Sequence, residues 1–277
     1  MENLALRESL AAVRENTPLV HCITNYVTVN DCANILLGCG ASPIMSDEAA
    51  DVEDIQRICN ALVLNIGTLN EHTIAGMEAA GRCATDLEHP IVLDPVGAGA
   101  SALRTQTAGK LLDSYGISVV RGNMSEVKAL AGTASATRGV DANPHDAVTL
   151  DNLEENAAFA KALAQRTGAI MAITGAIDIV TDGQRAFAVG NGTPLMGKIT
   201  GAGCMLTCLV AAFVAANGER PLEAVAAALC AMGAAGEMAQ ARMQPVDGNG
   251  GFRTYLLDAV TNINGDALEA IARIEEV

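Results

Sequence analysis

The sequence predicts an α/β fold in which helices cover both faces of a mostly parallel sheet. Short apolar runs, typical of strands buried on both faces, alternate with longer segments that carry helix start signals. This alternation is typical of parallel sheets, because a crossover helix joins consecutive parallel strands. The predicted strands are Leu19–Ile23, Ala41–Met45, Ala61–Ile66, Ile91–Asp94, Ser118–Arg121, Ala169–Thr174, Asp178–Thr181 and Ala186–Val189.

Helices are predicted between these strands and almost without interruption from Gly203 onward. Ser46-Asp47-Glu48 is predicted to open one helix, since acidic residues are favourable at the positive end of the helix dipole. Asp182-Gly183 separates the last two strands, which predicts a hairpin at one edge of the sheet. Gly132–Asp146 is poorly periodic and is predicted to be a surface loop rather than a flap over a nucleotide. The other helices are expected near Val27–Leu37, Leu69–Ala84, Leu103–Ser114, Ser125–Ala131 and Leu150–Arg166.

The composition is that of a globular protein and disfavours two classes of partner. Half of the 277 residues are hydrophobic, 18% are charged, and the net charge is −15. A chain of this length forms one large domain or two small ones, and we expect a single domain over residues 1–277. Without a Lys/Arg cluster to offset it, this negative charge argues against binding to nucleic acids and anionic membranes.

Neither secretion nor membrane insertion is expected. Eight cysteines without a CxxC pair, in a chain whose start is neither basic nor followed by an apolar run, predict reduced thiols in a cytoplasm. Ile199–Ala216 is uncharged and nearly long enough to cross a membrane. Its glycine-rich start and the lack of a second such segment favour a helix buried inside the protein.

Polar or glycine-rich groups follow almost every predicted strand. Because ligands bind at the carboxyl ends of the strands in an open parallel sheet, these groups mark the expected site. Asp94 and Glu126 stand at two strand ends and could share a divalent cation, as Mg²⁺ is usually held by one or two carboxylates. Asp94 is otherwise a turn residue before Pro95. Arg121 ends an apolar strand, where a cation requires an anionic partner.

Glu126 also has a structural interpretation, as a carboxylate in the first turn of a helix capped by Asn123 or Ser125. The stretch Thr200-Gly201-Ala202-Gly203-Cys204 is the strongest signal in the chain. A glycine-rich turn that leads into a helix leaves backbone N–H groups free for an anion, and Cys204 stands at the mouth of that site. A tight turn into a buried helix is the plain alternative.

Three other kinds of site have weaker support. Gly97–Ala102 fits the loose G-x-G-x-x-A dinucleotide fingerprint, but no acidic strand end lies about twenty residues further on. The P-loop pattern is absent, because Ile199 follows Gly197-Lys198. A nucleophilic pair of Cys204 with His21 stays open, although nothing in the spacing favours it.

Taken together, these motifs resemble the hydroxyethylthiazole kinases of the ribokinase-like superfamily, over essentially the whole chain. The block of Asn25-Tyr26-Val27-Thr28 combined with Gly201-Ala202-Gly203-Cys204 is highly specific. The motifs that carry the resemblance are His21–Thr28 with Asn30 and Ala33-Asn34, Gly40–Met45, Leu64–Thr68, Leu93–Ala98, Arg121-Gly122-Asn123 with Glu126, Ile173–Gly175 and Thr200–Cys204.

The resemblance implies a three-layer α/β/α ribokinase-like fold and transfer of the γ-phosphoryl group of ATP to the primary hydroxyl of 4-methyl-5-(2-hydroxyethyl)thiazole, in thiamine biosynthesis. It also implies a homotrimer with the thiazole bound between subunits, so that the Asn25–Asn34 block is expected to form a wall of a neighbour's substrate site. The residue roles it implies are thiazole contact by Met45, Gly201 and Asn25, ATP contact by Arg121, Thr174 and Asn123, and Mg²⁺ binding by Asp94 and Glu126.

Cys204 replaces the Asp that commonly serves as base in the superfamily, and the thiazole kinases are similar in placing Cys there. A thiol has a pKa near ~8.5 that helix N-termini lower, so we expect Cys204 to position the substrate hydroxyl and to accept its proton weakly. Two alternatives remain open. One is a related kinase for a hydroxymethylpyrimidine or pyridoxal, and the other is a nucleotide-binding dehydratase or sensor on the same scaffold.

Overall fold

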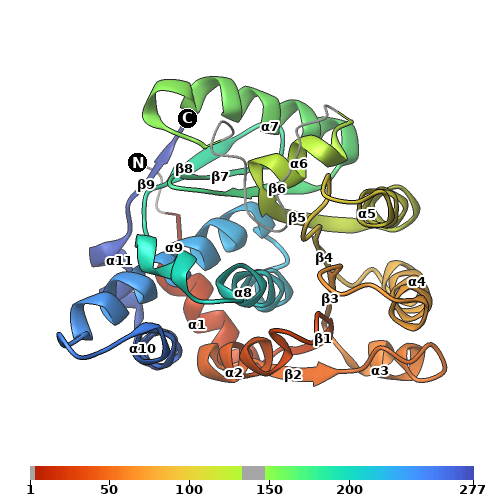
Figure 1. The fold of residues 1–277 in the computed structure, drawn as a ribbon, viewed down its shortest axis with the longest axis horizontal. Helices are drawn as coiled ribbons and strands as arrows, with labels where there is room; N and C mark the ends of the chain where they lie inside the picture. Colours follow the sequence, from red (N-terminus) through yellow and green to blue (C-terminus); the bar gives the residue numbers. More distant parts are fainter. Residues whose placement is uncertain (1–3, 133–146) are drawn as a thin grey trace.

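The computed structural model describes residues 4–132 and 147–277, so the predicted loop Gly132–Asp146 lies, apart from Gly132, outside the described residues. One sheet runs through the molecule (Figure 1). Its strands are β1 Leu19–Ile23, β2 Ser42–Met45, β3 Ala61–Asn65, β4 Ile91–Asp94, β5 Ile117–Asn123, β6 Ile170–Thr174, β7 Asp178–Thr181, β8 Ala186–Val189 and β9 Ile274–Glu276.

The strands follow the order β2-β1-β3-β4-β5-β6-β7-β8-β9. The six strands from β2 to β6 in this order pair in parallel, and the pairings that involve β7, β8 and β9 are antiparallel. The eight predicted strands are therefore confirmed. The predicted hairpin is also confirmed, but its place at the sheet edge is wrong, because β9 pairs with β8 and forms the edge.

Helices cover both faces of the sheet and build the predicted three layers (Figure 1). One apolar core joins α1, α2 and α8 to α11 to one face, and a second core joins α3 to α7 to the other. The helices are α1 Leu6–Asn16, α2 Val29–Cys39, α3 Val52–Ile58, α4 Glu71–Asp86, α5 Ala102–Ser114, α6 Met124–Leu130, α7 Leu153–Thr167, α8 Ala202–Ala216, α9 Pro221–Arg242, α10 Asn249–Asn262 and α11 Gly265–Ile271, with 3₁₀ turns η2 Leu150–Asn152 and η3 Pro194–Lys198.

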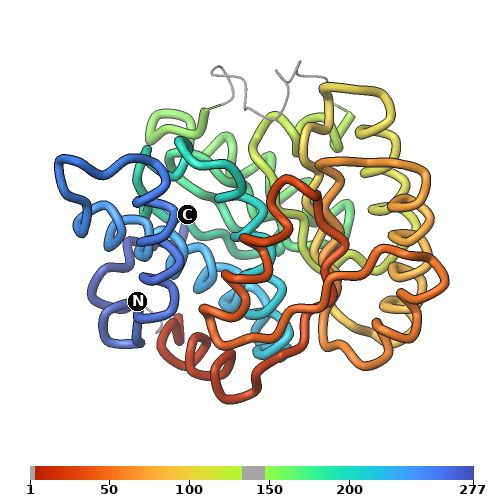
Figure 2. Tube along the Cα trace, turned by 60° about the horizontal axis from the view of Figure 1, so that its bottom comes forward, coloured from red at the N-terminus to blue at the C-terminus, as the bar shows by residue number. Residues whose placement is uncertain are grey.

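The two ends of the chain share one layer. Helices α1 and α2, near the N-terminus, pack against α8, α10 and α11, and Figure 2 shows these red and blue segments side by side. Helix α1 was not predicted, although Leu6, Leu10 and Val13 place a buried stripe on it. Its burial comes from the C-terminal helices, which are far away in sequence.

The predicted helix start at Ser46-Asp47-Glu48 is wrong, because α3 begins only at Val52. The carbonyl of Ser46 lies 2.9 Å from Nε2 of buried His21, and the Ser46 hydroxyl donates to Asp51 Oδ2 at 2.5 Å. These two bonds hold the end of β2 in an irregular turn. Tertiary contacts therefore outweigh the local helix signal.

The apolar helices of the C-terminal half form the core. Helix α8, which covers most of the segment considered for a membrane span, is buried along Met205–Val214. Helix α9 is the helix in the described part of the chain that is long and apolar enough to cross a membrane, and 83% of its most apolar window is buried inside the protein. Burial of this extent is what a core helix has.

The chain reverses its direction across the sheet at β1. From β1 it crosses to β2 on one side, and then to β3 on the other. Such a topological switch point opens a crevice at the carboxyl ends of the two strands that flank it, where ligands bind in open α/β sheets. Here those ends lead into Asn25 after β1 and Asn65 at the end of β3.

Candidate functional site

The N-terminus of α8 meets the carboxyl ends of the parallel strands at this switch point. Gly201 caps the helix with φ of 88°, in the left-handed region that favours glycine, and the cap makes no side-chain hydrogen bond. A Cβ on Gly201 would also lie 2.7 Å from Cγ2 of Thr28. The glycine-rich stretch therefore forms the predicted turn into a helix, with its first N–H groups uncapped.

Asp94 is fully buried at the end of β4 and is not simply a turn residue. Its Oδ2 accepts hydrogen bonds from Asn65 Nδ2 at 2.9 Å and from Thr207 Oγ1 at 2.7 Å, whereas its Oδ1 has no hydrogen-bond partner among the described residues. Burial raises the pKa of Asp94, against the lowering effect of the nearby Arg121. An oxygen buried in this way requires a partner, which residues 4–132 and 147–277 do not supply.

Strand β5 continues two residues beyond the predicted end at Arg121, and Arg121 finds the anionic partner that a cation in an apolar strand requires. Its Nη1 lies 3.6 Å from Asp94 Oδ2, and its Nη2 donates to Thr174 Oγ1 at 2.7 Å. Its Nε is buried and has no hydrogen-bond partner within the described part of the chain. A Cβ on Gly203 would lie 2.5 Å from Nη1, so the guanidinium rests directly on the first turn of α8. Arg121, Thr174 and the helix start thus form one cationic corner.

Glu126 takes the capping position that its sequence context allowed. Asn123 caps α6 through Glu126 N, and Glu126 Oε2 accepts from Asn123 N at 2.8 Å in return. Oε1 accepts from Gly97 N at 2.8 Å. Burial, and then the charge of Asp94, raise the pKa of Glu126 to about 7. The two carboxylates are therefore near enough to influence each other.

Cys204 lies in the first turn of α8, and its sulfur faces two asparagines. Asn25 Nδ2 and Asn65 Nδ2 each donate to Sγ at 3.2 Å. The expectation of a lowered pKa is wrong, because burial and then the charge of Asp94 raise the pKa of Cys204 to about 11.

Two residues of this network were missed as site residues. Asn65 belongs to one of the motifs that carry the resemblance, but no role was assigned to it, and Thr207 had no signal beyond its place in an apolar helix. Both donate to Asp94 from different elements. Asn25, by contrast, was named as a site residue, and the structure brings it to Cys204.

Met45 and His21 lie on opposite faces of the sheet. Met45 ends β2, pairs with Cys22 of β1, and packs against the core on the α8 face. His21 is fully buried, and its ring contacts Gln56 of α3 and the Ser46 carbonyl. The neighbour Ile23 belongs to the core of the α3–α7 face. His21 therefore points away from Cys204, and the nucleophilic pair that stayed open is excluded.

The glycines of the dinucleotide fingerprint serve another purpose. Gly97 and Gly99 have φ of 72° and 87°, and Gly97 N donates to Glu126 as described above. The sheet order around β1 also differs from the 3-2-1-4-5-6 order of a dinucleotide-binding fold. The loop after β4 thus shapes the Asp94–Glu126 region.

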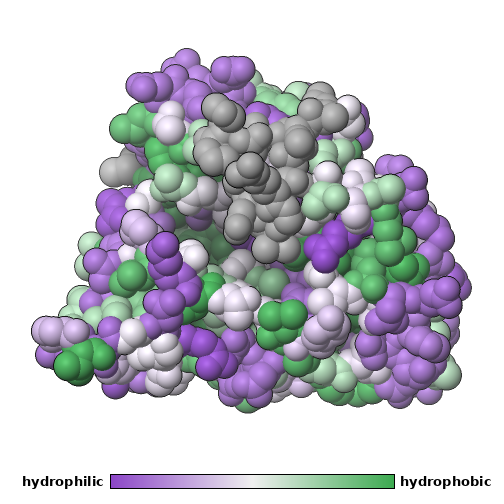
Figure 3. Space-filling view, viewed as in Figure 1, coloured by the Kyte–Doolittle hydropathy of each residue, from purple (hydrophilic) through white to green (hydrophobic). Residues whose placement is uncertain are grey.

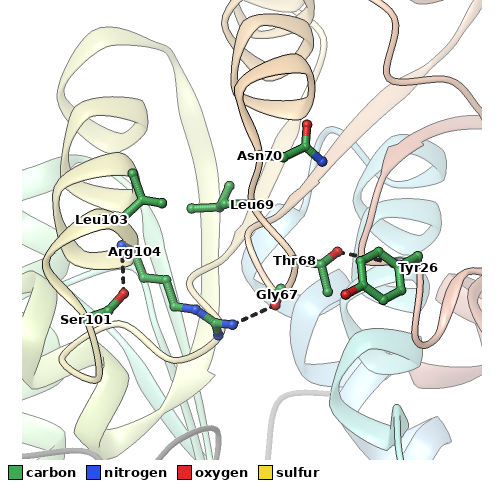
Figure 4. A pocket seen from close by; sticks show the side chains of 8 residues that line it. All are labelled: Tyr26, Gly67, Thr68, Leu69, Asn70, Ser101, Leu103 and Arg104. Atoms are coloured by element: carbon green, nitrogen blue, oxygen red, sulfur yellow. Dashed lines mark hydrogen bonds between the residues drawn. The ribbon is translucent and has the colours of Figure 1, made fainter.

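A pocket adjoins this site on the loop after β3 (Figure 4). Arg104 Nη2 reaches across it to the Gly67 carbonyl at 2.8 Å, while Gly67 N donates to Asn65 Oδ1 at 3.0 Å. Leu69 and Leu103 point toward each other on its apolar side (Figure 4). The pocket and the Cys204 network therefore meet at Gly67. Its lining residues are Tyr26, Gly67, Thr68, Leu69, Asn70, Ser101, Leu103 and Arg104.

The carboxylates of Asp94 and Glu126 fit an octahedral cation that takes most of its ligands from phosphates and water. Within the described residues, no three His, Cys, Asp or Glu side chains are grouped to hold a metal. Two carboxylates, one of them with a free oxygen, are what Mg²⁺ takes when phosphates and waters complete its shell. In Figure 3 one face of the molecule has a hollow in which hydrophobic residues are visible, and hydrophilic and hydrophobic residues both lie along its rim.

Comparisons with known proteins agree with this geometry. The model of the hydroxyethylthiazole kinase family matches residues 10–266. The hydroxyethylthiazole kinase of Clostridium acetobutylicum is 54% identical over 98% of this chain and 99% of that protein. A hydroxyethylthiazole kinase protein from Pyrococcus horikoshii OT3 superposes with a TM-score of 0.87, at 39% identity and 98% coverage of both chains.

A more distant structure shows the breadth of the fold. A ribokinase-like superfamily protein from Enterococcus faecalis superposes with a TM-score of 0.58 at 13% identity, and it covers 89% of this chain and 88% of that one. This likeness concerns the fold alone, which is the predicted three-layer ribokinase-like architecture. The family model and the relatives share nearly the full length of the sequence. The chain belongs to the hydroxyethylthiazole kinase family.

Proposed function

We propose that this protein transfers the γ-phosphoryl group of ATP to the primary hydroxyl of 4-methyl-5-(2-hydroxyethyl)thiazole. The observation that carries the proposal is the meeting of Asp94, Arg121 and the uncapped start of α8 at one point. Family membership supplies the substrate. Phosphoryl transfer needs alignment and charge stabilisation rather than covalent chemistry from the protein, and these groups provide both.

The cationic corner is the proposed anion hole for the transferring group. Arg121 contributes a fixed positive charge, since Thr174 and Asp94 hold its guanidinium. The N–H groups of Gly201–Cys204 and the helix dipole add donors that need no rearrangement during the reaction. Arg121 and Thr174 thereby contact ATP, and Asn123 supports them by capping α6.

Mg²⁺ belongs on the Asp94 side of the site. Asp94 Oδ1 is the free oxygen that would hold it, and Glu126, whose two oxygens already accept backbone N–H bonds, retains lone pairs for a water of its shell. When bound, Mg²⁺ neutralises charge on the phosphates. The chain's own part is to keep both carboxylates ionised beside Arg121, against the burial that raises their pKa values.

The alcohol is expected between Met45, Asn25 and Gly201, with its hydroxyl near Cys204. A thiol with a pKa of about 11 stays protonated near neutral pH, so Cys204 orients the hydroxyl and is not its principal base. In a loose transition state the hydroxyl proton leaves late, and a strong base is not required.

The proposed protein is a homotrimer of a single-domain chain and works in a cytoplasm. In this homotrimer, neighbouring subunits complete the substrate site. Tyr26 and Val27 are 77% and 57% exposed although both are large and apolar, and they follow Asn25 directly. An apolar surface of this kind beside a site is suited to contact with another chain. Size-exclusion chromatography with light scattering tests the assembly, and a monomeric mass would contradict it.

ADP release in the presence of three alcohols tests the function. The purified protein is assayed with Mg-ATP and, separately, the thiazole alcohol, a hydroxymethylpyrimidine and pyridoxal. We expect kcat/KM to be at least about 10²-fold higher for the thiazole alcohol. A preference for another alcohol would favour the related kinases, and no ADP release with any alcohol would favour the dehydratase or sensor.

The metal assignment has its own test. Asp94→Asn should lower kcat by at least about 10²-fold, because it removes a charge without changing the volume. Glu126→Gln should raise the Mg²⁺ concentration for half-maximal activity, and an unaltered Mg²⁺ dependence would remove Glu126 from the site. Asp113→Asn, on an exposed position of α5, is the matched control and should leave both quantities unchanged.

A further inference from the structure

The orientations of two side-chain amides in the site are fixed by the backbone. Asn25 Oδ1 accepts from Thr28 N at 3.1 Å, and Asn65 Oδ1 accepts from Gly67 N at 3.0 Å. A backbone N–H can only donate, so each amide must turn its oxygen toward it and its Nδ2 the other way. The Nδ2 groups therefore face Cys204 Sγ, which accepts from both.

Asn65 donates to Asp94 as well as to Cys204, whereas Asn25 donates to Cys204 but not to Asp94. Its two amide hydrogens are shared between Cys204 Sγ at 3.2 Å and Asp94 Oδ2 at 2.9 Å. The side chain is nearly fully buried at the end of β3, and Asn25 Nδ2 donates to its Oδ1 at 3.0 Å. Every polar atom of the Asn65 amide is thus engaged. A shift of this amide would move both of its partners.

We propose that Asn65 is a positioning residue, whose one amide holds the Asp94 carboxylate by Oδ2 and the Cys204 sulfur at the same time. With Thr207 also bound to Oδ2, this leaves Oδ1 as the free oxygen of Asp94. The Asn65 amide also sets the spacing between the Asp94 carboxylate, on the metal side, and the Cys204 thiol, beside the accepting hydroxyl. The part that concerns turnover rests on the kinase function proposed above.

Three substitutions separate the two contacts. Asn65→Ala removes both. Asn25→Ala removes a donor to Cys204 and none to Asp94, and Thr207→Val removes a donor to Asp94 and none to Cys204 while keeping the side-chain shape. If Asn65→Ala does not fold, Asn65→Asp keeps the oxygen that accepts from Gly67 and loses the donors. Asn70→Asp is its charge control, since Asp also caps helices and Asn70 caps α4.

Alkylation of Cys204 by iodoacetamide tests the contact between Asn65 and the Cys204 sulfur, and it needs no substrate, metal or turnover. Cys204 is partly exposed, whereas the other seven cysteines are buried, so mass spectrometry can follow it alone. Amide donors stabilise the thiolate, and their loss should slow alkylation at pH 8 by about tenfold in Asn65→Ala and in Asn25→Ala. In Thr207→Val the rate should stay within about twofold of the wild-type rate.

The rate of turnover tests the contact between Asn65 and Asp94. Asn65→Ala should lower kcat by about 10²-fold and change both KM values less than about threefold, as misalignment of reacting groups does. Its effect should also be smaller in a Cys204→Ala background and in a Thr207→Val background than in the wild type, because residues that act through a shared partner are not additive.

Unchanged alkylation in Asn65→Ala, or additive losses of kcat in both backgrounds, would overturn the proposal. Faster alkylation accompanied by reaction of the buried cysteines would show a merely structural role and would also overturn it. A wild-type protein that phosphorylates no alcohol would instead contradict the proposed function. In that case the alkylation rates alone would still decide whether Asn65 and Asn25 hold the sulfur.

Discussion

The guanidinium of Arg121 rests directly on Gly203, so closely that a Cβ on this glycine would stand 2.5 Å from Nη1 and 3.0 Å from Cζ. Thr174 and Asp94 fix the same guanidinium from the strand side. The positive charge is therefore clamped between the sheet and the first turn of α8. The second glycine of the Gly201–Cys204 stretch is explained by this contact, and not by an unusual backbone angle.

Gly203→Ala should lower activity without unfolding the protein. The added methyl displaces Arg121 from the helix start, while Ala itself suits a helix. We expect kcat to fall by about 10- to 10²-fold, measured by ADP release. Gly109→Ala is the matched control, since Gly109 also lies in a helix and its Cβ would meet no atom within 4 Å. Equal activity of the two variants would contradict the role assigned to the contact.

Gly201→Ala should destabilise the protein more than a positive φ alone explains. Gly168 has φ of 74° with no atom within 4 Å of a Cβ, so Gly168→Ala reports the backbone strain, about 1–2 kcal/mol. At Gly201 the methyl also meets Thr28 Cγ2, which adds about 1–3 kcal/mol. Chemical denaturation of both variants measures the difference.

The double variant Gly201→Ala with Thr28→Ser isolates that contact. Ser removes Cγ2 and keeps the hydroxyl that donates to Asn25 Oδ1 at 3.0 Å. It should recover part of the lost free energy of unfolding. Equal losses in Gly168→Ala and Gly201→Ala, or no recovery in the double variant, would show that Thr28 does not press on the glycine.

The fold was predictable where local side chains decide it. A continuous apolar run such as Ala61-Leu62-Val63-Leu64 indicates a strand buried on both faces without knowledge of its neighbours. β9 has a single apolar residue, Ile274, followed by two glutamates, and its pairing depends on β8 and on contacts such as Arg185 with Glu276 at 3.3 Å. No pattern within such a short charged segment predicts a strand.

The site was predictable as a set of strand ends but not as a network. Asp94 and Arg121 stood out because charged groups that end apolar strands require partners. Asn65 and Thr207 are ordinary polar residues in sequence, and their roles come from Asp94, which lies 29 and 113 positions away from them. The pKa of Cys204 likewise depends on burial by distant segments, which local helix-dipole reasoning omits.

Cys204 should behave as a protonated thiol throughout the neutral range. With a pKa of about 11, only about one thiol in 10³ is ionised at pH 8, and ionisation rises about tenfold for each pH unit below that pKa. Alkylation by iodoacetamide should follow this rise without a plateau below about pH 10. A plateau near pH 8 would show that the helix N-terminus does lower the pKa.

The same protonation state predicts the pH profile of turnover. Neither the Cys204 thiol nor a serine hydroxyl ionises between about pH 6 and 9, so Cys204→Ser should shift the level of kcat but not the shape of its pH profile. A limb of the profile that disappears in Cys204→Ser would identify Cys204 as a titrating base. Wild-type turnover in Cys204→Ala would remove the positioning role as well.

His21 connects the core to the turn that follows Met45, and its protonation should affect stability. Its Nε2 lies 2.9 Å from the Ser46 carbonyl and its Nδ1 3.0 Å from the Gln56 amide, which in turn contacts His89 Nδ1 at 3.0 Å. Burial lowers the pKa of His21, although Ser46, Gln56 and the charge of Asp51 act in the opposite direction. Both partners of the ring, the Ser46 carbonyl and Gln56 Oε1, are oxygen acceptors, and the neutral ring has a single N–H to donate to one of them.

A histidine whose pKa is lower in the folded state binds fewer protons there than in the unfolded chain. The free energy of unfolding should therefore fall as the pH drops below about 6.5. His21→Phe should be less stable at pH 7, by about 1–3 kcal/mol for the unsatisfied partners, but should lose less on acidification than the wild type. His72→Phe, at an exposed position of α4, should keep the wild-type pH dependence. Urea titrations at pH 5 and pH 7 decide this, and parallel losses in all three proteins would mean that another group governs the acid sensitivity.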